Sequence, residues 1–442
     1  MTIAIPLARV PDLAAWHFGA PDVWPWWLHS SSRGGRLARW SVLLHPAANS
    51  RPLIAQPGGA ADFFAALDQH WQAEQRPCSD AFPFAGGWFI FLGYEAAGWI
   101  EPRLVLPEST DGLPCAFAQR CDAAVVVDHQ LGAAWLLCES GATGQDLKAL
   151  LESEAPGASQ LPDWPAIDVR AEPGERFMQG VERIREYIRA GDVFQVNLSR
   201  GWQVDADGEI GPAALYRRLV AANPAPFAGS MRLPGGWLLS SSPERLVAVR
   251  DGRVETRPIA GTRPRGVDRN ADTALSAELL AHPKERAEHI MLIDLERNDL
   301  GRVCVTGSVR VDELMVLESY AHVHHIVSNV SGTLRPGVTP GEVIKAVFPG
   351  GTITGCPKVR CMEIIAELEA QGRGFYTGSA GYLGLDGRLD LNILIRSMLV
   401  RERQILFRTG AGIVADSEPV SELAETEAKA RGLLNALEHR AG

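Results

Sequence analysis

Residues 177–199 read FMQGVERIREYIRAGDVFQVNLS, a helix pattern followed directly by a strand pattern. Apolar side chains recur at helical spacing, at Phe177, Val181, Ile184 and Ile188. This spacing predicts an amphipathic helix that stops near Gly191, and VFQVNLS then predicts a strand over 193–199. Further strands are predicted at 87–92, 123–127, 133–138, 238–242, 246–250 and 381–385. Because strands follow strands without a regular helix between them, the sequence favours an α+β fold over a doubly wound one.

The composition is that of an ordinary globular protein. The 442 residues, 46% hydrophobic and 22% charged, exclude disorder and a disulfide scaffold. The net charge is −10 and no basic block is present, so a nucleic-acid partner is not expected. No apolar run reaches the ~18 residues of a membrane helix, and the N-terminus lacks a signal-peptide pattern. Seven cysteines without a C-x-x-C pair indicate a reduced, cytoplasmic protein.

The chain divides into two parts that differ in composition. All 12 tryptophans lie at or before Trp237, whereas the motif-like glycine clusters lie mostly after Gly191. The stretch 141–175 is rich in Ala, Gly, Pro and acidic residues, which is typical of a short helix with a linker. We therefore place a boundary near residue 165, between regions 1–165 and 166–442.

Two glycine-rich stretches resemble nucleotide-binding loops but lack what those loops need. Residues 410–415 (GAGIVA) match G-x-G-x-x-A, yet the following helix leads to no second strand and no acid for a ribose. In residues 350–358 (GGTITGCPK), two residues separate the last glycine from the lysine. A helix that begins at Pro357 and ends at Gly372 is expected here. Thr352 and Thr354 precede it, so this helix start is either an anion site or an ordinary cap.

The last predicted helix carries carboxylates on one face. Glu422 and Glu425 are three residues apart, and Lys429 lies one turn beyond Glu425. These residues form either a surface ion pair or an oxygen-rich magnesium site, which needs only one or two carboxylates with water and substrate. The preceding residues 410–412 are expected to be a loop whose backbone N–H groups bind a carboxylate beside the metal.

Two further groups of titratable side chains remain ambiguous. Glu288 lies at the edge of the apolar face of a helix predicted over 284–301, and a solvated glutamate is the alternative. His322, His324 and His325 alternate along a predicted strand, so His325 points away from the other two. No further ligands are spaced to complete a zinc site. A structural or substrate-contacting histidine is the better interpretation.

Seven segments of residues 166–442 resemble, in order, those of the chorismate-utilising enzymes. This family includes component I of anthranilate synthase, component I of aminodeoxychorismate synthase, and the isochorismate and salicylate synthases. The segments are GDVFQVNLSR (191–200), SSPERLV (241–247), RPIAGTRPRG (257–266), KERAEHIMLIDLERNDLGRV (284–303), FPGGTITGCPKVRCMEII (348–365), GFYTGSAGY (374–382) and RTGAGIVADSEPVSELAETEAKA (408–430). The resemblance implies two facing, largely antiparallel sheets with helices packed outside. It also implies an N-terminal region of the anthranilate synthase component I type over 1–165.

The resemblance implies roles for individual residues. Glu244 matches the general acid that protonates the departing 4-hydroxyl of chorismate. Glu288 and Glu425 match magnesium ligands, with Glu422 contributing through water. The residues that match substrate contacts are Tyr376 and Arg396 for the enolpyruvyl carboxylate, Lys429, Gly410, Ala411 and Gly412 for the ring carboxylate, and Ala260, Gly261, Thr262 and His325 beside the ring.

These implied roles agree with the chemistry of the substrate. Chorismate is a dianion, so a site on an acidic protein needs Mg²⁺, Arg and Lys to offset repulsion. Hydroxide is a poor leaving group, and burial raises the pKa of a glutamate enough for it to donate a proton at neutral pH. Magnesium on the ring carboxylate turns the ring into an electron sink.

The nucleophile is the feature that separates members of the family. The water-adding enzymes resemble this chain except for a lysine at the position of Gln195, and glutamine has no basic nitrogen to activate water. Ammonia is therefore favoured as nucleophile. Nothing in the chain resembles a glutaminase domain, so a separate glutamine amidotransferase subunit is expected to supply it.

Two ammonia-using subgroups remain. ANPAPF (222–227), Asn197 and FPGGTITG (348–355) resemble aminodeoxychorismate synthase component I, which aminates C4 for 4-aminobenzoate and folate synthesis. Ala260 opposes this, because those enzymes carry a lysine there that is thought to attack C2, whereas anthranilate synthases resemble this chain in having alanine. Anthranilate formation is thus the alternative. A non-catalytic relative is a further one, although Glu244 and every metal ligand are present.

Overall fold

The computed structural model describes residues 2–32, 37–56, 62–156, 164–319 and 323–438. The predicted α+β fold is confirmed, and every strand pairing in these ranges is antiparallel. The strands of the N-terminal part are β1 (Ile3–Pro6), β2 (Trp26–His29), β3 (Trp40–Pro46), β4 (Leu53–Ala55), β5 (Gly87–Leu92), β6 (Ala116–Asp128) and β7 (Ala133–Cys138). The predicted hairpin is β6–β7.

The long strand β6 joins two series of strands, which we name the first and second arms. The first half of β6 pairs with β5, and its second half pairs with β3. The first arm continues from β5 through β18 (Ser379–Gly384), β19 (Leu389–Asn392), β12 (Arg245–Arg250), β13 (Arg253–Thr256) and β16 (Val323–Thr333), with β14 (Ile259–Pro264) and β15 (Arg310–Ser319) beside β16.

The second arm continues from β3 to the last strand of the chain. It runs through β2, β10 (Phe227–Leu233), β11 (Gly236–Ser242), β20 (Ser397–Arg401), β21 (Gln404–Ile413) and β9 (Gln195–Ala206), with β8 (Ile167–Ala171) and the short β17 (Gly355–Cys356) beside β9. The two predicted sheets are therefore continuous with each other in the described residues, because β6 pairs with both arms.

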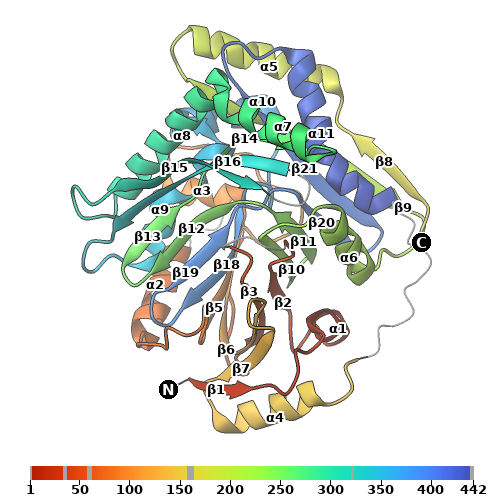
Figure 1. The fold of residues 1–442 in the computed structure, drawn as a ribbon, viewed down its shortest axis with the longest axis vertical. Helices are drawn as coiled ribbons and strands as arrows, with labels where there is room; N and C mark the ends of the chain where they lie inside the picture. Colours follow the sequence, from red (N-terminus) through yellow and green to blue (C-terminus); the bar gives the residue numbers. More distant parts are fainter. Residues whose placement is uncertain (1, 33–36, 57–61, 157–163, 320–322, 439–442) are drawn as a thin grey trace.

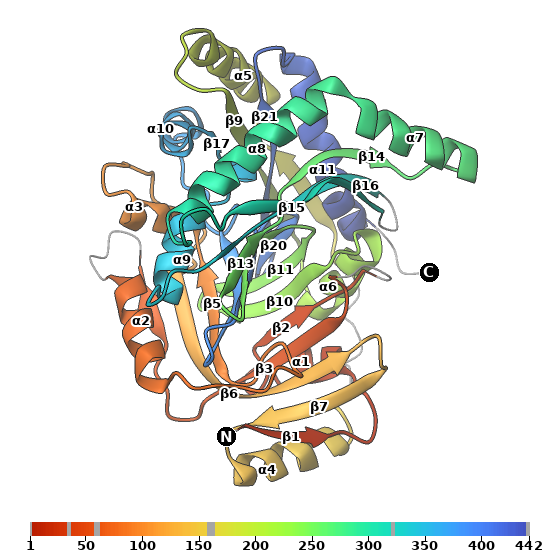
Figure 2. The ribbon, with the colours of Figure 1, turned by 60° about the vertical axis from the view of Figure 1, so that its left-hand side comes forward.

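Helices cover the outer surfaces of the arms. They are α1 (Leu13–Gly19), α2 (Phe63–Glu74), α3 (Ala97–Ile100), α4 (Gly141–Glu152), α5 (Gly174–Arg189), α6 (Pro212–Ala222), α7 (Arg269–Ala281), α8 (Pro283–Gly301), α9 (Pro340–Val347), α10 (Lys358–Glu369) and α11 (Pro419–Glu438), with 3₁₀ turns η1 (Tyr94–Ala96) and η2 (Gly351–Ile353). α8 packs on β14 and β16, and α5, α10 and α11 pack around β9 and β21. Figures 1 and 2 show α5 at the end of the molecule opposite to β1, β7 and α4.

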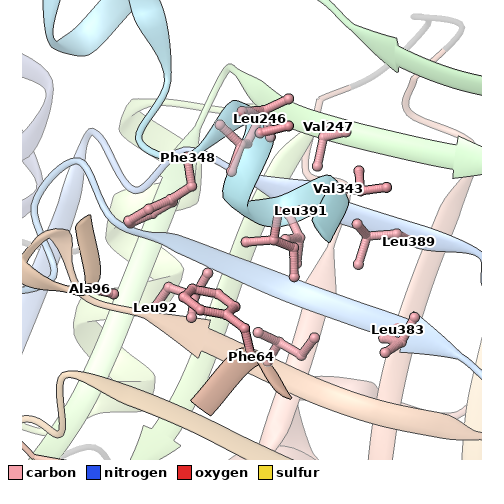
Figure 3. Close-up of a cluster of buried hydrophobic side chains, with 14 of the residues drawn as sticks. Phe64, Leu92, Ala96, Leu246, Val247, Val343, Phe348, Leu383, Leu389 and Leu391 are labelled. Atoms are coloured by element: carbon pink, nitrogen blue, oxygen red, sulfur yellow. The ribbon is translucent and has the colours of Figure 1, made fainter. Parts of the chain in front are cut away.

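The two parts predicted from composition share a sheet and a core. β2 pairs with β10 and β5 pairs with β18, so each arm begins with strands from before residue 165 and continues with strands from after it. One core cluster combines Phe64 and Leu92 from the N-terminal part with Leu246, Val343 and Leu391 (Figure 3). Burying each such side chain contributes roughly 1.5–3 kcal/mol to the stability of the fold. Because the buried side chains come from both parts, neither part forms this core alone. The boundary near residue 165 stays a prediction about the sequence.

One predicted helix end is wrong. α10 ends at Glu369, and Ala370 takes the left-handed conformation with φ 51°. Gly372 has a different role, because a Cβ there would lie 2.4 Å from the backbone N of Ser109. The glycine allows two backbone segments to approach closely, a requirement that local helix signals do not reveal.

Neither a membrane helix nor a disulfide is present in the described ranges. None of the helices there combines enough length with enough apolar character to cross a bilayer. All seven cysteines lie in these ranges and none is paired with another.

Candidate active site

Glu244 lies where the chain crosses from the second arm to the first, between β11 and β12. A second crossover, between β19 and β20, runs beside it. The N–H of Ile393 donates to the Glu244 carbonyl at 3.0 Å, and the N–H of Ser241 donates to the Arg396 carbonyl at 3.1 Å. Arg396 has a φ of 50°, a conformation that costs a non-glycine residue about 1 kcal/mol. The paired crossovers therefore hold an acid and a cation side by side.

The Glu244 carboxyl is a buried group that can carry a proton at neutral pH. It is 5% exposed, and the Thr352 hydroxyl on η2 donates to its Oε1 at 2.8 Å. Burial raises its pKa to about 7, because the desolvation exceeds the opposing effect of the Thr352 hydrogen bond. The nearby Glu296 carboxyl also raises the pKa, and Lys429 lowers it. This environment suits a general acid.

The Arg396 guanidinium is fixed by the segment ANPAPF. Its Nη1 donates to the Asn223 side-chain oxygen at 3.1 Å. The Asn223 side-chain nitrogen donates in turn to the Ser241 carbonyl at 3.1 Å. Burial lowers the pKa of Arg396, while Glu244 opposes that shift. A partly desolvated arginine held in this way is suited to bind a carboxylate.

Residues 410–412 lie in strand β21, so the predicted loop is wrong. Gly410 is opposite Ser199 and Gly412 is opposite Asn197 on β9. The N–H groups of both β9 residues point away from β21, since Asn197 donates to the Thr354 carbonyl and Ser199 donates to Glu369. In an antiparallel ladder, the N–H groups of Gly410 and Gly412 must then also point away from the partner strand. The N–H groups along β21 alternate in direction, and those of Gly410 and Gly412 face away from β9. The strand therefore supplies the outward-facing amides that a loop was expected to supply.

The glycines of β21 leave room for side chains from neighbouring elements. A Cβ at Gly412 would lie 2.3 Å from the Gln195 side-chain nitrogen. One at Gly410 would lie 2.9 Å from both the Asn197 side-chain oxygen and the Tyr376 hydroxyl. Tyr376 is buried, and burial raises its pKa to about 12, so it stays a neutral hydrogen-bond donor.

Helix α11 contacts the same part of β21. The Lys429 ammonium donates to the Gly410 carbonyl at 3.0 Å and forms an ion pair with Glu425 at 2.7 Å. Because Lys429 also influences Glu244 electrostatically, the structure brings together the acid, Arg396, Lys429 and the β21 glycines.

The first arm contributes His325 and the strand opposite it. His325 is 2% exposed, and burial, together with Arg396, lowers its pKa to about 3, so the ring is neutral. Its pKa also responds to a hydrogen bond with the Gly261 backbone. β14 has an irregular register between Ala260, which is buried, and Thr262, which is opposite His325. Gly261 has a φ of 70°, and a Cβ there would lie 2.9 Å from a Glu285 oxygen of α8.

His324 points away from this cluster, as strand alternation predicts. Its ring nitrogens contact Asp272 at 2.9 Å and Ser319 at 2.7 Å. His322 lies outside the described residues. Among the described His, Cys, Asp and Glu side chains, no group of three is arranged to hold a metal ion.

The predicted magnesium ligands come from two helices. Glu288 is half-buried on α8, next to His289, whose ring contacts Ser328 of β16 at 2.6 Å. On α11, Glu422 is buried and Glu425 is exposed. The three glutamates do not form a closed site by themselves, and their convergence around a metal stays a prediction.

Three residues near the site had no assigned role in the site predicted from the sequence. Thr352 donates to the acid, so its hydroxyl is not free at the start of α10. Glu296 lies on α8 beside η2, and burial raises its pKa to about 7. Asn197 is two residues from Gln195 and therefore on the same face of β9. That spacing was the available signal for Asn197. Thr352 and Glu296 act on Glu244 from distant parts of the sequence, so no local signal could have found them.

A groove of about 760 Å³ is lined by residues of α3, α8 and the start of α10. Phe194, which is 67% exposed, lies at this groove, but none of the predicted site residues lines it. The candidate site is therefore defined by converging polar groups and not by this cavity.

Comparisons with known proteins agree with the geometry. The family model described as chorismate binding enzyme matches residues 31–435. Aminodeoxychorismate synthase component 1 of Bacillus subtilis is 44% identical over 370 residues, 81% of this chain and 78% of the relative. Anthranilate synthase component 1 of Streptomyces coelicolor is 39% identical over 442 residues, 94% of this chain and 84% of the relative. The crystal structure of anthranilate synthase component I from Streptococcus pneumoniae superposes with a TM-score of 0.80 at 32% identity, covering 90% and 93% of the two chains.

Proposed function

The chain belongs to the chorismate-binding enzyme family, and we propose that it is component I of an aminodeoxychorismate synthase. In this role it aminates chorismate at C4 to give 4-amino-4-deoxychorismate, the precursor of 4-aminobenzoate. The similarity to the Bacillus subtilis relative and the segments around 197, 222–227 and 348–355 support this choice within the family.

The observation that carries an enzymatic role is the buried Glu244 beside two cations. Arg396 and Lys429 suit the two carboxylates of chorismate, and a pKa of about 7 keeps a substantial share of Glu244 protonated. A protein that merely binds chorismate has no use for a buried proton donor, whose desolvation costs stability.

The reaction balances with this acid as the donor. The ammonia nitrogen forms a bond to C4 while the C4–O bond breaks, and the Glu244 proton goes to the departing oxygen to give water. The C4 ammonium group then returns one proton to the Glu244 carboxylate. Tyr376 and Arg396 orient the enolpyruvyl carboxylate, and the outward N–H groups of β21 with Lys429 orient the ring carboxylate. His325, being neutral, lies beside the ring without adding charge.

A magnesium ion fits the chemistry of the available donors. Glu288, Glu425 and, through water, Glu422 offer hard carboxylate oxygens, and Mg²⁺ is held by one or two carboxylates together with substrate oxygens. When bound, the ion would neutralise the ring carboxylate and draw electron density from the ring.

Ammonia comes, in this proposal, from a separate glutamine amidotransferase subunit. The relatives are named as components, which supports a multi-subunit enzyme. Gln195 cannot act as a base toward water, which supports ammonia as the nucleophile.

Anthranilate synthase component I is the second candidate, and Ala260 favours it. Alanine cannot attack C2, so no covalent intermediate forms there, and ammonia must reach C4 directly or add at C2. Addition at C2 followed by loss of pyruvate gives anthranilate. The relative from Streptomyces coelicolor also supports this candidate.

One assay separates the candidates. Purified protein is incubated with ammonium chloride, Mg²⁺ and chorismate, with and without the lyase that converts aminodeoxychorismate to 4-aminobenzoate. We expect 4-aminobenzoate in the coupled reaction. Fluorescent anthranilate without the lyase would select the second candidate, and no amine product would reject both.

The variant Ala260→Lys tests the role of this position. If access to C2 decides the outcome, the lysine changes the ratio of 4-aminobenzoate to anthranilate. An unchanged ratio would show that Ala260 does not control the site of attack.

A further inference from the structure

Three successive backbone N–H groups, those of residues 373–375, donate to carboxylates. The first donates to Glu95 Oε1 at 2.7 Å, and the second donates to both Glu95 oxygens, at 3.2 and 3.1 Å. The third donates to an Asp111 oxygen at 3.0 Å. Successive N–H groups that converge in this way form a nest that favours negative charge. In this protein, two of its own side chains occupy the nest.

Both carboxylates come from the N-terminal part of the chain. Glu95 lies in η1, directly after β5, and Asp111 lies shortly before β6. The second Asp111 oxygen accepts from the N–H of Leu113 at 3.0 Å, which fixes this side chain. Gly374 has a φ of 59°, and a Cβ there would overlap an Asp111 oxygen. The glycine therefore admits a carboxylate from 264 positions earlier in the chain to the nest.

Two carboxylates are an expensive way to satisfy three N–H groups. Burial raises the pKa of Glu95 to about 7, because the desolvation exceeds the opposing effect of its backbone hydrogen bonds, and Asp111 raises it further. Neutral acceptors would pair the same N–H groups without burying charge. Hydrogen bonds to a carboxylate are, however, roughly twice as strong as neutral ones. The arrangement therefore favours a firmly held backbone over a low cost of burial.

The backbone held in this way leads directly to Tyr376. The N–H of Tyr376 donates to the Arg373 carbonyl at 3.1 Å, and its ring centroid lies 5.6 Å from the Arg373 guanidinium carbon. Thr377 follows with a φ of 61°, and its N–H donates to the Leu394 carbonyl at 2.9 Å. The Tyr376 hydroxyl reaches Gly410 of β21. The nest on one side and Leu394 on the other therefore determine where this hydroxyl lies.

We propose that Glu95 and Asp111 are positioning residues for Tyr376, through which the N-terminal part sets how firmly the site binds the enolpyruvyl carboxylate. This inference rests on the proposed function, in which Tyr376 orients that carboxylate. The enolpyruvyl carboxylate does not react during amination at C4. A displaced Tyr376 therefore weakens the ground state and the transition state alike, which raises the KM for chorismate and leaves kcat unchanged.

A double-mutant cycle between Glu95→Gln and Tyr376→Phe tests the proposal. Glutamine replaces one acceptor oxygen with a donor, so we expect the KM for chorismate to rise about three- to tenfold, up to the contribution of one hydrogen bond, with kcat within about twofold. In the Tyr376→Phe background, the same change should alter this KM less than about twofold, because its route to the substrate is gone. Glu101→Gln, six residues further on at the groove of α3 and α8, is the matched control and should leave both constants unchanged.

Other outcomes would overturn the proposal. An unchanged KM in Glu95→Gln, when Tyr376→Phe raises it, would reject the inference alone. Equal effects of Glu95→Gln with and without the Tyr376 hydroxyl would assign Glu95 to general stability. If Glu95→Gln does not fold, Asp111→Asn carries the same expectations through the third N–H of the nest. An unchanged KM in Tyr376→Phe would reject the substrate contact and the inference with it, whereas a wild type that makes no amine product would reject the proposed function.

Discussion

Two buried glutamates of this protein have opposite electrostatic environments. Glu244 is 5% exposed and has a single side-chain donor, Thr352, and its pKa is raised. Glu369 is 3% exposed, and although burial acts to raise its pKa, Arg373 and Arg408 lower it below the usual value. Ser199 also donates to Glu369 through its N–H and its hydroxyl. Burial therefore makes a proton donor of one carboxyl, and matched cations make a permanent anion of the other.

The largest expected effect follows from Glu244→Gln, which removes the proposed acid. We expect kcat to fall about 10²–10⁴-fold, the usual contribution of general acid catalysis. Thermal unfolding should be unchanged near neutral pH. Thr352→Val is the matched control, since it removes the hydrogen bond but keeps the acid. Equal losses in the two variants would mean that Glu244 has a structural role and does not act as the acid.

Glu369→Gln should lower the stability of the fold, whereas Glu244→Gln should lower kcat. It leaves the buried Arg373 and Arg408 without their anion, which typically costs about 3–5 kcal/mol in the free energy of unfolding. Urea denaturation would measure this loss, with Glu367→Gln, exposed on the same helix, as control. The stabilisation by ionised Glu369 is present above its unfolded pKa and is lost as pH falls through its lower folded pKa. A variant as stable as the wild type would contradict the ion-pair role.

The proposed metal ligands should show a third behaviour. Glu425→Gln and Glu288→Gln each remove a hard anionic ligand, so we expect turnover to require at least about tenfold more Mg²⁺. Magnesium titrations of activity would measure this requirement. Glu427→Gln, exposed on the same helix as Glu425, is the control. Unaltered magnesium dependence in both ligand variants would reject the assignment.

The smallest expected effect concerns pH. Glu244 must be protonated to donate, so activity should fall as pH rises through about 7. Glu296 faces it from α8, Lys429 from α11 and Arg396 from the neighbouring crossover. Glu296→Gln removes the like charge, lowers the pKa of Glu244 and moves this alkaline limb to lower pH. Asp294→Asn, exposed on the same helix, should leave the limb in place. A limb that does not move would exclude Glu296 as an influence on the acid.

The sequence was sufficient for the elements whose signals are local. The helix before Gly191, the strands at 238–242 and 246–250 and the carboxylate-bearing last helix appear in the structure. The family resemblance also located Glu244 and Arg396, which the structure brings together. By contrast, the glycine-rich composition of residues 410–412 is typical of a loop. These residues form a strand because they pair with β9, and that pairing is not visible in the local sequence.

Long-range electrostatics was the other part that the sequence did not reveal. Arg373 lies four residues after Glu369, so one of the two arginines was visible in the local sequence. Arg408 is 39 positions from Glu369, and Thr352 is 108 positions from Glu244. These two partners come from distant parts of the chain, and only the fold reveals them.

The adjoining crossovers that carry Glu244 and Arg396 connect the two arms inside the candidate site. His325 belongs to the first arm and Gly410 to the second, so their separation depends on how the arms are packed. The acid and the arginine are held together by the backbone hydrogen bonds of Ile393 and Ser241. Their spacing, on which proton transfer to a bound carboxylate substrate would depend, is therefore set by the main chain.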